Sequence, residues 1–376
     1  MTSPMTFDVV DNQPFVTLGR ERCSLPALWL RERSRAASLC DPVTGQRLFN
    51  PHELPEDLGF EMAVVADGAL QVTYSDGFRD SYALEDLKAA IAQDNGLPSV
   101  TTWAAVDGAG KIFDWQKLKD DDRETLACVE AFLARGFVIL ENTPTERDSI
   151  LSVAAHFGQV RHTNFGRFFE VYSRPGSNDL AYRPVPLAPH TDNPYRNPVP
   201  GIQILHCLAN ETTGGHSTLV DGFRVCDQLQ DEDPEGFQLL KEIEVGFRFR
   251  DGQAHLTDRH PMIETDHLGR PTGIHYSPRL DETPLLDPAV LRSFHRARNR
   301  LGSLLSDPEN EFRFLLEQGQ LMMFDNNRVL HGRTAYDPDE GLRHLQGCYI
   351  DRDGPESLYR VLSAQDQPAA DVREVA

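Results

Sequence analysis

In the stretch Pro189-His190-Thr191-Asp192-Asn193-Pro194-Tyr195, a histidine is followed two positions later by a carboxylate, which happens nowhere else in the 376 residues. On a β-strand, or in the loop that leaves it, residues i and i+2 point to the same side. His190 and Asp192 could therefore occupy two adjacent positions of one metal ion. A further imidazole would complete a set of two histidines and one carboxylate, which leaves three metal positions open for substrate chemistry.

The candidate for that further imidazole lies far downstream, at His331. Between the two segments, residues 202–208 form a strand-like run, and Gly214-Gly215 supplies a tight turn shortly before the hydroxyl of Thr218. Twelve residues beyond His331, a second strand-like run begins at Arg343. With 13 histidines in the chain, one His-x-Asp pair is expected by chance, so the order of these features is what makes a metal site credible.

Three motifs are specific in combination: His190-Thr191-Asp192-Asn193-Pro194-Tyr195-Arg196, Leu330-His331-Gly332-Arg333 and Arg343-His344-Leu345-Gln346-Gly347-Cys348-Tyr349. They resemble those of the iron(II)/2-oxoglutarate-dependent dioxygenases of the taurine dioxygenase and γ-butyrobetaine hydroxylase group, and the resemblance covers nearly the whole chain. It implies that His190, Asp192 and His331 bind Fe(II), and that 2-oxoglutarate and O₂ are converted to succinate and CO₂. Related halogenases leave the carboxylate position empty for chloride, so the presence of Asp192 favours hydroxylation.

The same resemblance implies how 2-oxoglutarate is anchored. Its distal carboxylate needs a cation, preferably a planar one with two donors. Arg343 matches the family residue with that role, and Thr218 matches the hydroxyl that assists it. Arg333, close to His331, is an alternative for the same task.

The substrate side rests on aromatic residues. Members of this group that act on trimethylammonium compounds surround the cation with aromatic faces, because a quaternary ammonium cannot donate a conventional hydrogen bond and cation–π attraction remains. Phe165, Phe169, Tyr182 and Tyr349 fall at or near positions that match such a cage. Asn193 departs from the pattern, since some members have an aromatic residue there. The alternative is that these rings only fill the core.

The pattern of elements predicts two domains, mainly β with flanking helices. Residues 1–93 are expected to form a small β-rich domain, 94–114 a linker rich in glycine and proline, and 115–376 the catalytic domain. Many short strands and few α/β crossovers favour a double-stranded β-helix, or jelly roll, for the catalytic domain. Its helices are expected at 122–135, 146–157 and 288–305.

In the amino-terminal domain, Trp29-Leu30-Arg31-Glu32-Arg33 resembles a motif of γ-butyrobetaine hydroxylases, whose corresponding domain usually holds a zinc ion through three cysteines and a histidine. This chain departs from that pattern. Residues 34–39 contain no cysteine, which leaves Cys40 alone, and Phe78 stands where the histidine is expected. One thiol cannot make a four-ligand site, so we predict that no zinc is bound here.

The anionic end of the substrate would be bound by Arg183, which directly follows Tyr182. Several arginines near the site suit a phosphonate better than a carboxylate. Together with the missing zinc ligands, they slightly favour 2-(trimethylammonio)ethylphosphonate over γ-butyrobetaine. Two alternatives stay open: a taurine dioxygenase-like enzyme acting on a sulfonate or an amino acid, and a non-catalytic metal-binding jelly-roll protein. Further candidates for the anionic end are Asn164, Arg161, Arg167, Ser277 and Arg279.

Composition narrows the partners and the compartment. A net charge of −21 argues against nucleic acids and anionic membranes, which both require a basic surface. No apolar run reaches membrane-spanning length, and the first residues do not resemble a signal peptide. The six cysteines are scattered, which fits reduced thiols. We expect a cytoplasmic enzyme with a small-molecule substrate, assembled as a homodimer.

Overall fold

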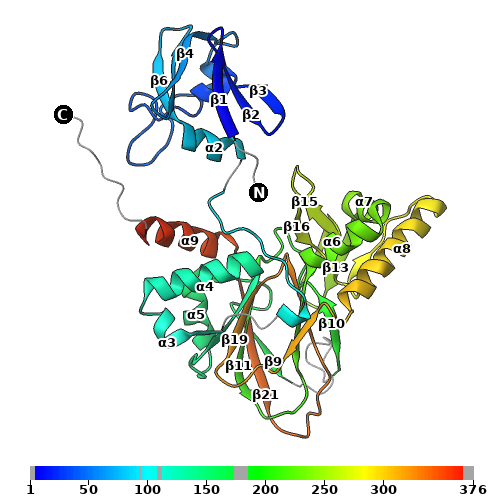
Figure 1. Ribbon diagram of the computed structural model, residues 1–376. Helices are drawn as coiled ribbons and strands as arrows, with labels where there is room; N and C mark the ends of the chain where they lie inside the picture. Colours follow the sequence, from blue (N-terminus) through cyan, green and yellow to red (C-terminus); the bar gives the residue numbers. More distant parts are fainter. Residues whose placement is uncertain (1–4, 93–94, 108–111, 173–184, 367–376) are drawn as a thin grey trace. The chain divides into compact units, whose positions relative to one another are not determined.

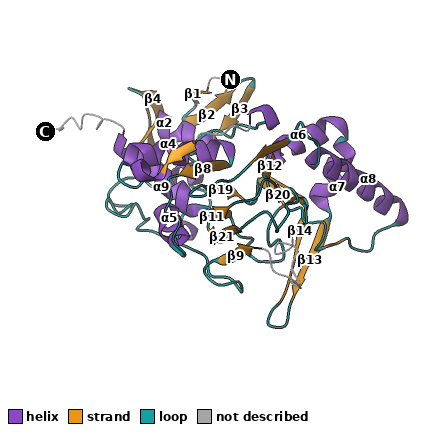
Figure 2. Cartoon of the chain, turned by 90° about the horizontal axis from the view of Figure 1, so that it is seen from below, coloured by secondary structure: helices purple, strands orange, loops and turns teal. Residues whose placement is uncertain are grey.

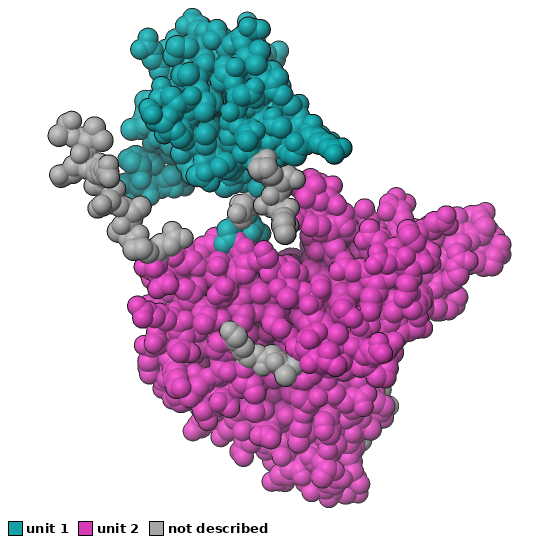
Figure 3. All heavy atoms as spheres, viewed as in Figure 1, with its two compact units in different colours: residues 1–96 teal, residues 97–376 magenta. Residues whose placement is uncertain are grey.

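The computed structural model describes residues 5–92, 95–107, 112–172 and 185–366. The chain divides into two compact units, Met1–Gly96 and Leu97–Ala376, which Figure 3 colours separately. Each unit has its own buried cluster of apolar side chains. Among the described residues, no helix has both the length and the apolar character that crossing a membrane requires.

Unit 1 contains two three-stranded antiparallel sheets over one core (Figure 1). Each sheet starts with a tight hairpin. Asp11 and Asn12 in one turn, and Asp67 and Gly68 in the other, all have positive φ, as a two-residue type I′ hairpin turn requires. The elements are β1 (Met5–Val10), β2 (Gln13–Leu18), β3 (Glu21–Ser24), α1 (Ala27–Arg31), η1 (Pro51–Glu53), β4 (Phe60–Ala66), β5 (Ala69–Tyr74), β6 (Arg79–Ala83) and α2 (Leu84–Ala92).

In unit 1, Arg31 contacts Phe78 and Asp76 in the region where the resemblance implies zinc ligands. The guanidinium carbon of Arg31 lies 3.7 Å from the centre of the Phe78 ring, and its Nη2 donates to Asp76 at 3.0 Å. Cys40 is buried, and Nη1 of Arg35 lies 3.6 Å from its sulfur. A cation is therefore stacked on Phe78, at the position where the resemblance implies a zinc-binding histidine.

We expect unit 1 to bind no zinc, because its two thiols, the exposed Cys23 and the buried Cys40, fall short of the three cysteines and one histidine that the resemblance implies. Elemental analysis of the full chain, purified without added zinc, should give the same zinc content for the wild type and for Cys40→Ser. A stoichiometric zinc that is present in the wild type and lost in Cys40→Ser would contradict this prediction.

Unit 2 is built on two β-sheets that together form a jelly roll (Figure 2). Their strand orders are β10-β20-β12-β18 and β7-β8-β19-β11-β21-β9, and neighbours are antiparallel apart from the parallel pair β7–β8. One buried cluster takes side chains from both sheets, among them Leu205, Leu219 and Met322. This confirms the predicted double-stranded β-helix. The strands are β7 (Ile112–Asp114), β8 (Phe137–Glu141), β9 (Phe169–Tyr172), β10 (Leu187–His190), β11 (Ile202–Asn210), β12 (Ser217–Asp221), β18 (Glu311–Phe314), β19 (Leu321–Asp325), β20 (Val329–Arg333) and β21 (Arg343–Ile350).

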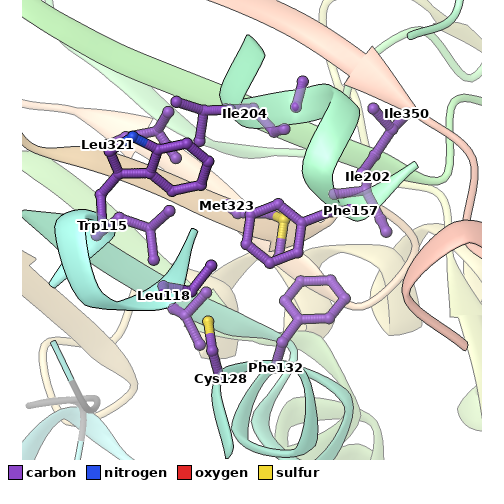
Figure 4. Close-up of a cluster of buried hydrophobic side chains, with 14 of the residues drawn as sticks. Trp115, Leu118, Cys128, Phe132, Phe157, Ile202, Ile204, Leu321, Met323 and Ile350 are labelled. Carbon is purple, nitrogen blue, oxygen red and sulfur yellow. The ribbon is translucent and has the colours of Figure 1, made fainter. Parts of the chain in front are cut away.

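Helices cover the other face of the six-stranded sheet. β11 is buried on both faces, so Ile202 and Ile204 point to the helices while Leu205 points between the sheets. Figure 4 shows the resulting cluster, in which Phe157 lies between Phe132 and Ile204. The helices around it are α3 (Trp115–Leu118), α4 (Asp122–Arg135), α5 (Ser149–Phe157) and α9 (Asp353–Asp366).

A third group of elements lies against the four-stranded sheet and has a buried cluster of its own. Its helices pack on one another and on two small antiparallel sheets, of order β14-β13-β17 and β15-β16. The elements are α6 (Gly222–Glu232), α7 (Pro234–Glu242), β13 (Glu244–Arg250), β14 (His255–Pro261), β15 (Ile263–Thr265), β16 (Pro271–Ile274), β17 (Asp281–Glu282) and α8 (Pro288–Leu305).

Residues 97–107, which were assigned to the linker, pack into unit 2. Trp103 is only 1% exposed, and its backbone N–H donates to Asp221 at 3.1 Å. The backbone carbonyl of Thr101 accepts a 2.7 Å hydrogen bond from the buried Arg328. The short helix η2 (Ala105–Asp107) follows. This segment is therefore tied to the catalytic unit by side chains from distant parts of the chain.

Candidate active site

Two histidines and an aspartate converge at the end of the four-stranded sheet. β10 and β20 are antiparallel, and their register sets His190 directly opposite His331. A 2.9 Å hydrogen bond joins Nδ1 of His190 to the carbonyl of Ala188. The Nε2 atom of the same ring lies 3.5 Å from Oδ1 of Asp192, and Nε2 of His331 lies 4.0 Å from that oxygen. The three groups are thus close enough to share one metal ion.

The backbone around Asp192 is held by the side chain of Asn326, in the turn between β19 and β20. Its Oδ1 accepts from the N–H of Asp192 at 2.7 Å, and its Nδ2 donates to the carbonyls of Asp192 and Pro200 at 3.0 and 2.9 Å. On the other side, the N–H of Thr191 donates to the carbonyl of Tyr276 at 2.8 Å. These four hydrogen bonds connect the loop that carries Asp192 to distant parts of the chain.

The ionisation of these groups suits a divalent cation. Burial alone would raise the pKa of the Asp192 carboxyl, but the two histidines and the Tyr349 hydroxyl hold that pKa well below its usual value. The hydroxyl of Tyr349 donates to Oδ2 of Asp192 at 2.8 Å. Burial, with a contribution from His190, lowers the pKa of His331 to about 3. At neutral pH the site therefore offers an ionised carboxylate and a neutral imidazole, the forms that bind metals.

A cavity of about 380 Å³ opens above these three residues, and aromatic side chains form much of its wall. The Tyr195 and Phe249 rings stack with centroids 5.0 Å apart, and Phe165 meets Phe249 edge-on at 5.7 Å. Phe169 and Tyr349 lie 5.5 Å apart. Because Tyr349 also bonds to Asp192, the aromatic wall begins at the metal-binding residues themselves.

Another part of the lining is basic. Arg343 is 5% exposed; its Nη2 donates to the carbonyl of Gly215 at 3.3 Å, while Nε and Nη1 find no hydrogen-bond partner among the described residues. Gly215 has a φ of 70°, and a Cβ there would lie 2.8 Å from Nε of Arg343, so only glycine fits. Burial and the neighbouring Arg343 lower the pKa of Arg333 to about 10, which still leaves it charged at neutral pH. The cavity thus holds two buried cations.

The hydroxyl that lines the cavity belongs to Ser217 and not to Thr218. Ser217 pairs with Arg333 across the β12–β20 ladder, and directly opposed residues point to the same face. Thr218 pairs with Gly332, where a Cβ would lie 2.7 Å from its Oγ1. That Oγ1 is buried and has no hydrogen-bond partner within the described part of the chain. The cavity wall therefore includes the hydroxyl of Ser217, and the role of Thr218 in binding 2-oxoglutarate stays a prediction.

The other predicted substrate residues are divided by the structure. Phe165, Phe169, Tyr349 and Asn193 line the cavity. Asn193 has a φ of 54°, which asparagine tolerates better than most residues, and its Oδ1 accepts from the Tyr195 hydroxyl at 2.5 Å. Tyr182 and Arg183 lie outside the described residues. Of the further anion-binding candidates, the cavity lining includes Ser277 and Arg279 but not Asn164, Arg161 or Arg167.

Several lining residues were missed in the sequence. Tyr195 stands in the opening motif itself, but nothing in the motif indicates that its ring faces the substrate. Phe249 comes from the β13–β14 hairpin, where the alternation Phe247-Arg248-Phe249 predicts a strand but not its place over the cavity. Arg248 and Arg250, on either side of Phe249, also line the cavity.

The known proteins to which this chain is similar include several dioxygenases. Residues 96–349 match the family described as taurine catabolism dioxygenase TauD, TfdA family. The chain is 33% identical to the γ-butyrobetaine dioxygenase of Pseudomonas sp. (strain AK-1), with 90% of each chain covered. It is 26% identical to the trimethyllysine dioxygenase of Meyerozyma guilliermondii, with 92% of each covered. A crystal structure of a taurine dioxygenase from Burkholderia xenovorans shares 18% identity, with a TM-score of 0.48 over 64% of this chain and 90% of that one.

The chain belongs to the TauD/TfdA family of dioxygenases. It is an Fe(II)/2-oxoglutarate-dependent dioxygenase, as the resemblance of its motifs implied. This sets aside the alternative of a non-catalytic metal-binding protein.

Proposed function

We propose that Nε2 of His190, Oδ1 of Asp192 and Nε2 of His331 hold the iron. Ligands about 2.1 Å from an ion and at right angles to each other lie about 3.0 Å apart, so the observed 3.5 and 4.0 Å need only a small contraction. When bound, Fe(II) and 2-oxoglutarate together activate O₂ to an oxidant that can hydroxylate an aliphatic carbon. Tyr349 keeps Oδ2 of Asp192 occupied, which leaves Oδ1 for the metal.

In this proposal, Arg343 binds the distal carboxylate of 2-oxoglutarate. Its buried Nε and Nη1 groups have no hydrogen-bond partner among the described residues, and a carboxylate would satisfy two such donors at once. Ser217 lies opposite Arg333 in the β12–β20 ladder, and its side chain lines the cavity. It supplies a hydroxyl to that carboxylate. Arg333 adds positive charge close by.

We further propose that the substrate is a small zwitterion with a trimethylammonium head and an anionic tail, hydroxylated on a carbon between them. One observation carries this. Among the described residues that line the cavity, Asp192 is the only carboxylate, whereas five aromatic rings are present. An ammonium with N–H donors, as in taurine, would find no second carboxylate in this lining once Asp192 binds metal, only neutral acceptors such as Oε1 of Gln203. A trimethylammonium group needs only aromatic faces. The rings are those of Phe165, Phe169, Tyr195, Phe249 and Tyr349.

The names of the relatives support the same head group, because γ-butyrobetaine and trimethyllysine are both trimethylammonium compounds. For the tail, the lining offers Arg279, Arg250 and Arg248, the last of which already pairs with Glu282 at 2.8 Å. Ser277 and the side-chain amide of Asn193 add neutral donors. Two or three cations can neutralise a carboxylate or a phosphonate, so γ-butyrobetaine and 2-(trimethylammonio)ethylphosphonate are the two compounds to compare.

The full chain, supplied with Fe(II) and 2-oxoglutarate, should add one oxygen to at least one of these two trimethylammonium compounds and release an equal amount of succinate. Mass spectrometry of parallel reactions, with taurine as the third arm, measures this directly. A neutral tert-butyl analogue of the accepted substrate should compete at least about tenfold less well, since it keeps the shape but loses the cation–π attraction. Oxygen gain on taurine alone, or equal competition by the analogue, would show that the rings are only core.

A further inference from the structure

A second group of metal-binding side chains lies outside the dioxygenase site, in the β14–β16 region. Within the described residues, only His260, Glu264 and His275 join the iron-site triad as a cluster with ligand atoms all within 4.8 Å of one another. Oε1 of Glu264 lies 3.0 Å from Nε2 of His275 and 4.0 Å from Nδ1 of His260. The two imidazole rings stack with centroids 4.5 Å apart. One carboxylate oxygen therefore faces a nitrogen of each ring.

The fold builds this cluster through two adjoining pairs of strands. Glu264 of β15 pairs with Gly273 of β16, and a Cβ at position 273 would lie 2.8 Å from Oε2 of Glu264. The missing side chain thus leaves room for the carboxylate to lie across the ladder. The N–H of His275 donates to the carbonyl of Met262 at 2.9 Å, which continues that ladder by one residue. His260 arrives from the end of β14.

His275 has unusual surroundings for an ordinary core histidine. It is 3% exposed, and neither ring nitrogen makes a hydrogen bond with the described residues, although Nε2 lies within ion-pair distance of Glu264. Buried polar atoms nearly always have a partner. Burial, with the neighbouring His275, lowers the pKa of His260, so this imidazole keeps a lone pair at neutral pH. Two stacked imidazole rings beside one carboxylate form a ligand set for a metal ion.

We propose that His260, Glu264 and His275 bind a divalent transition-metal ion, best matched by zinc. Two histidines and a glutamate are a ligand set that zinc accepts, with a water molecule as the fourth ligand. In a tetrahedral site, neighbouring ligands lie about 3.4 Å apart, between the observed 3.0 and 4.0 Å. Glu264 is 42% exposed at its side chain, which provides the path for ion and water. Oδ2 of Asp258 lies 3.3 Å from Nε2 of His260, at ion-pair distance but without hydrogen-bond geometry.

The position of this site gives it a structural role in catalysis. His275 immediately precedes Tyr276, whose backbone N–H and carbonyl both bond to Thr191, between His190 and Asp192. Ser277, two residues after His275, lines the substrate cavity. A metal at His275 would fix the segment that supports the dioxygenase site from behind. It would not contact substrate, so these three residues act by positioning.

Zinc binding by the full chain in a His331→Ala background tests the proposal, because that change weakens the iron site. After loading with Zn²⁺ and dialysis, this variant should retain about one zinc per chain, and loading with Co²⁺ instead should give the visible absorption of a tetrahedral site. Adding Glu264→Gln, which keeps the side chain's volume, or His275→Ala should remove both signals. Adding His267→Ala, an exposed histidine in the β15–β16 turn, should change neither.

The thermal unfolding midpoint provides a second measurement that does not depend on turnover. Zinc should raise it in the His331→Ala protein and leave it unchanged once Glu264→Gln is added, because an ion stabilises only the state that binds it. The proposal is overturned if the His331→Ala protein retains no zinc, or if Glu264→Gln and His275→Ala both leave zinc binding intact. The first result would mean that the cluster is a metal-free ion-pair network.

Discussion

Replacing His331 with alanine is expected to abolish oxygen-dependent turnover while the protein still folds. The change removes one of the three proposed iron ligands and leaves a two-residue site. Loss of an outer-shell partner alone costs a metal site up to about 100-fold, so the loss here should be larger. The assay is succinate formation with Fe(II), 2-oxoglutarate and the accepted trimethylammonium substrate. A parallel measurement of Fe(II) binding should show the loss directly.

His295→Ala is the matched control, because this histidine lies on the exposed face of α8. Both variants should unfold cooperatively on heating, which separates loss of the site from loss of the fold. Normal product formation by His331→Ala with excess Fe(II) would remove His331 from the metal site, whatever the substrate turns out to be.

Arg343→Ala should raise the KM for 2-oxoglutarate by at least about tenfold, since a hydrogen bond to a charged group contributes about 1.5–3 kcal/mol and about 1.4 kcal/mol corresponds to a factor of ten. The guanidinium is buried, and Nε and Nη1 have no other partner among the described residues, so its removal takes away two donors that are free to bind the carboxylate. Steady-state kinetics with 2-oxoglutarate as the varied reactant measure the effect.

Two further variants, Arg343→Lys and Arg333→Ala, test which arginine binds 2-oxoglutarate and whether its two donors are needed. Lysine keeps the charge but not the planar pair of donors, so it should recover only part of the affinity. Arg333→Ala should have the smaller effect of the two alanine variants, because this side chain already donates to the carbonyl of Val185 at 3.0 Å. An unchanged KM in Arg343→Ala, with a large increase in Arg333→Ala, would exchange the roles.

The elements that could be predicted from the sequence are those with local signals at both ends. α4 begins after Asp121, whose side chain accepts from the N–H of Arg123, and ends at Gly136, whose φ of 81° suits glycine. α8 begins in the same way, with Asp287 as its cap and proline in its first turn. In both helices, the residues that mark the ends lie within a few positions of those ends, so the bounds can be predicted without knowledge of tertiary contacts.

The features that could not be predicted depend on contacts between distant segments. Trp103 lies in a stretch rich in linker residues, yet it is buried because Asp221 and the Arg135 carbonyl accept its two N–H groups. Ser217 and Thr218 are neighbours on β12, so their side chains point to opposite faces of the sheet. The sequence alone does not tell which of the two hydroxyls faces the cavity. Phe249 reaches the cavity only because the β13–β14 hairpin folds over it, and no local pattern encodes that direction.

The register that sets His190 opposite His331 has a further consequence for local motion. β10 is joined to β20 by only two aligned pairs, with an irregularity between them, and it lies at the end of its sheet. An ion bound by His190 and His331 links parts of the chain that are about 140 residues apart. Few backbone hydrogen bonds connect β10 to β20, so the ion adds a connection where the ladder is weak. A bound iron ion would thus hold the edge strand β10 against β20. Its loss would first increase amide hydrogen exchange in β10 and the Asp192 loop, while the apolar cluster between the sheets stays protected.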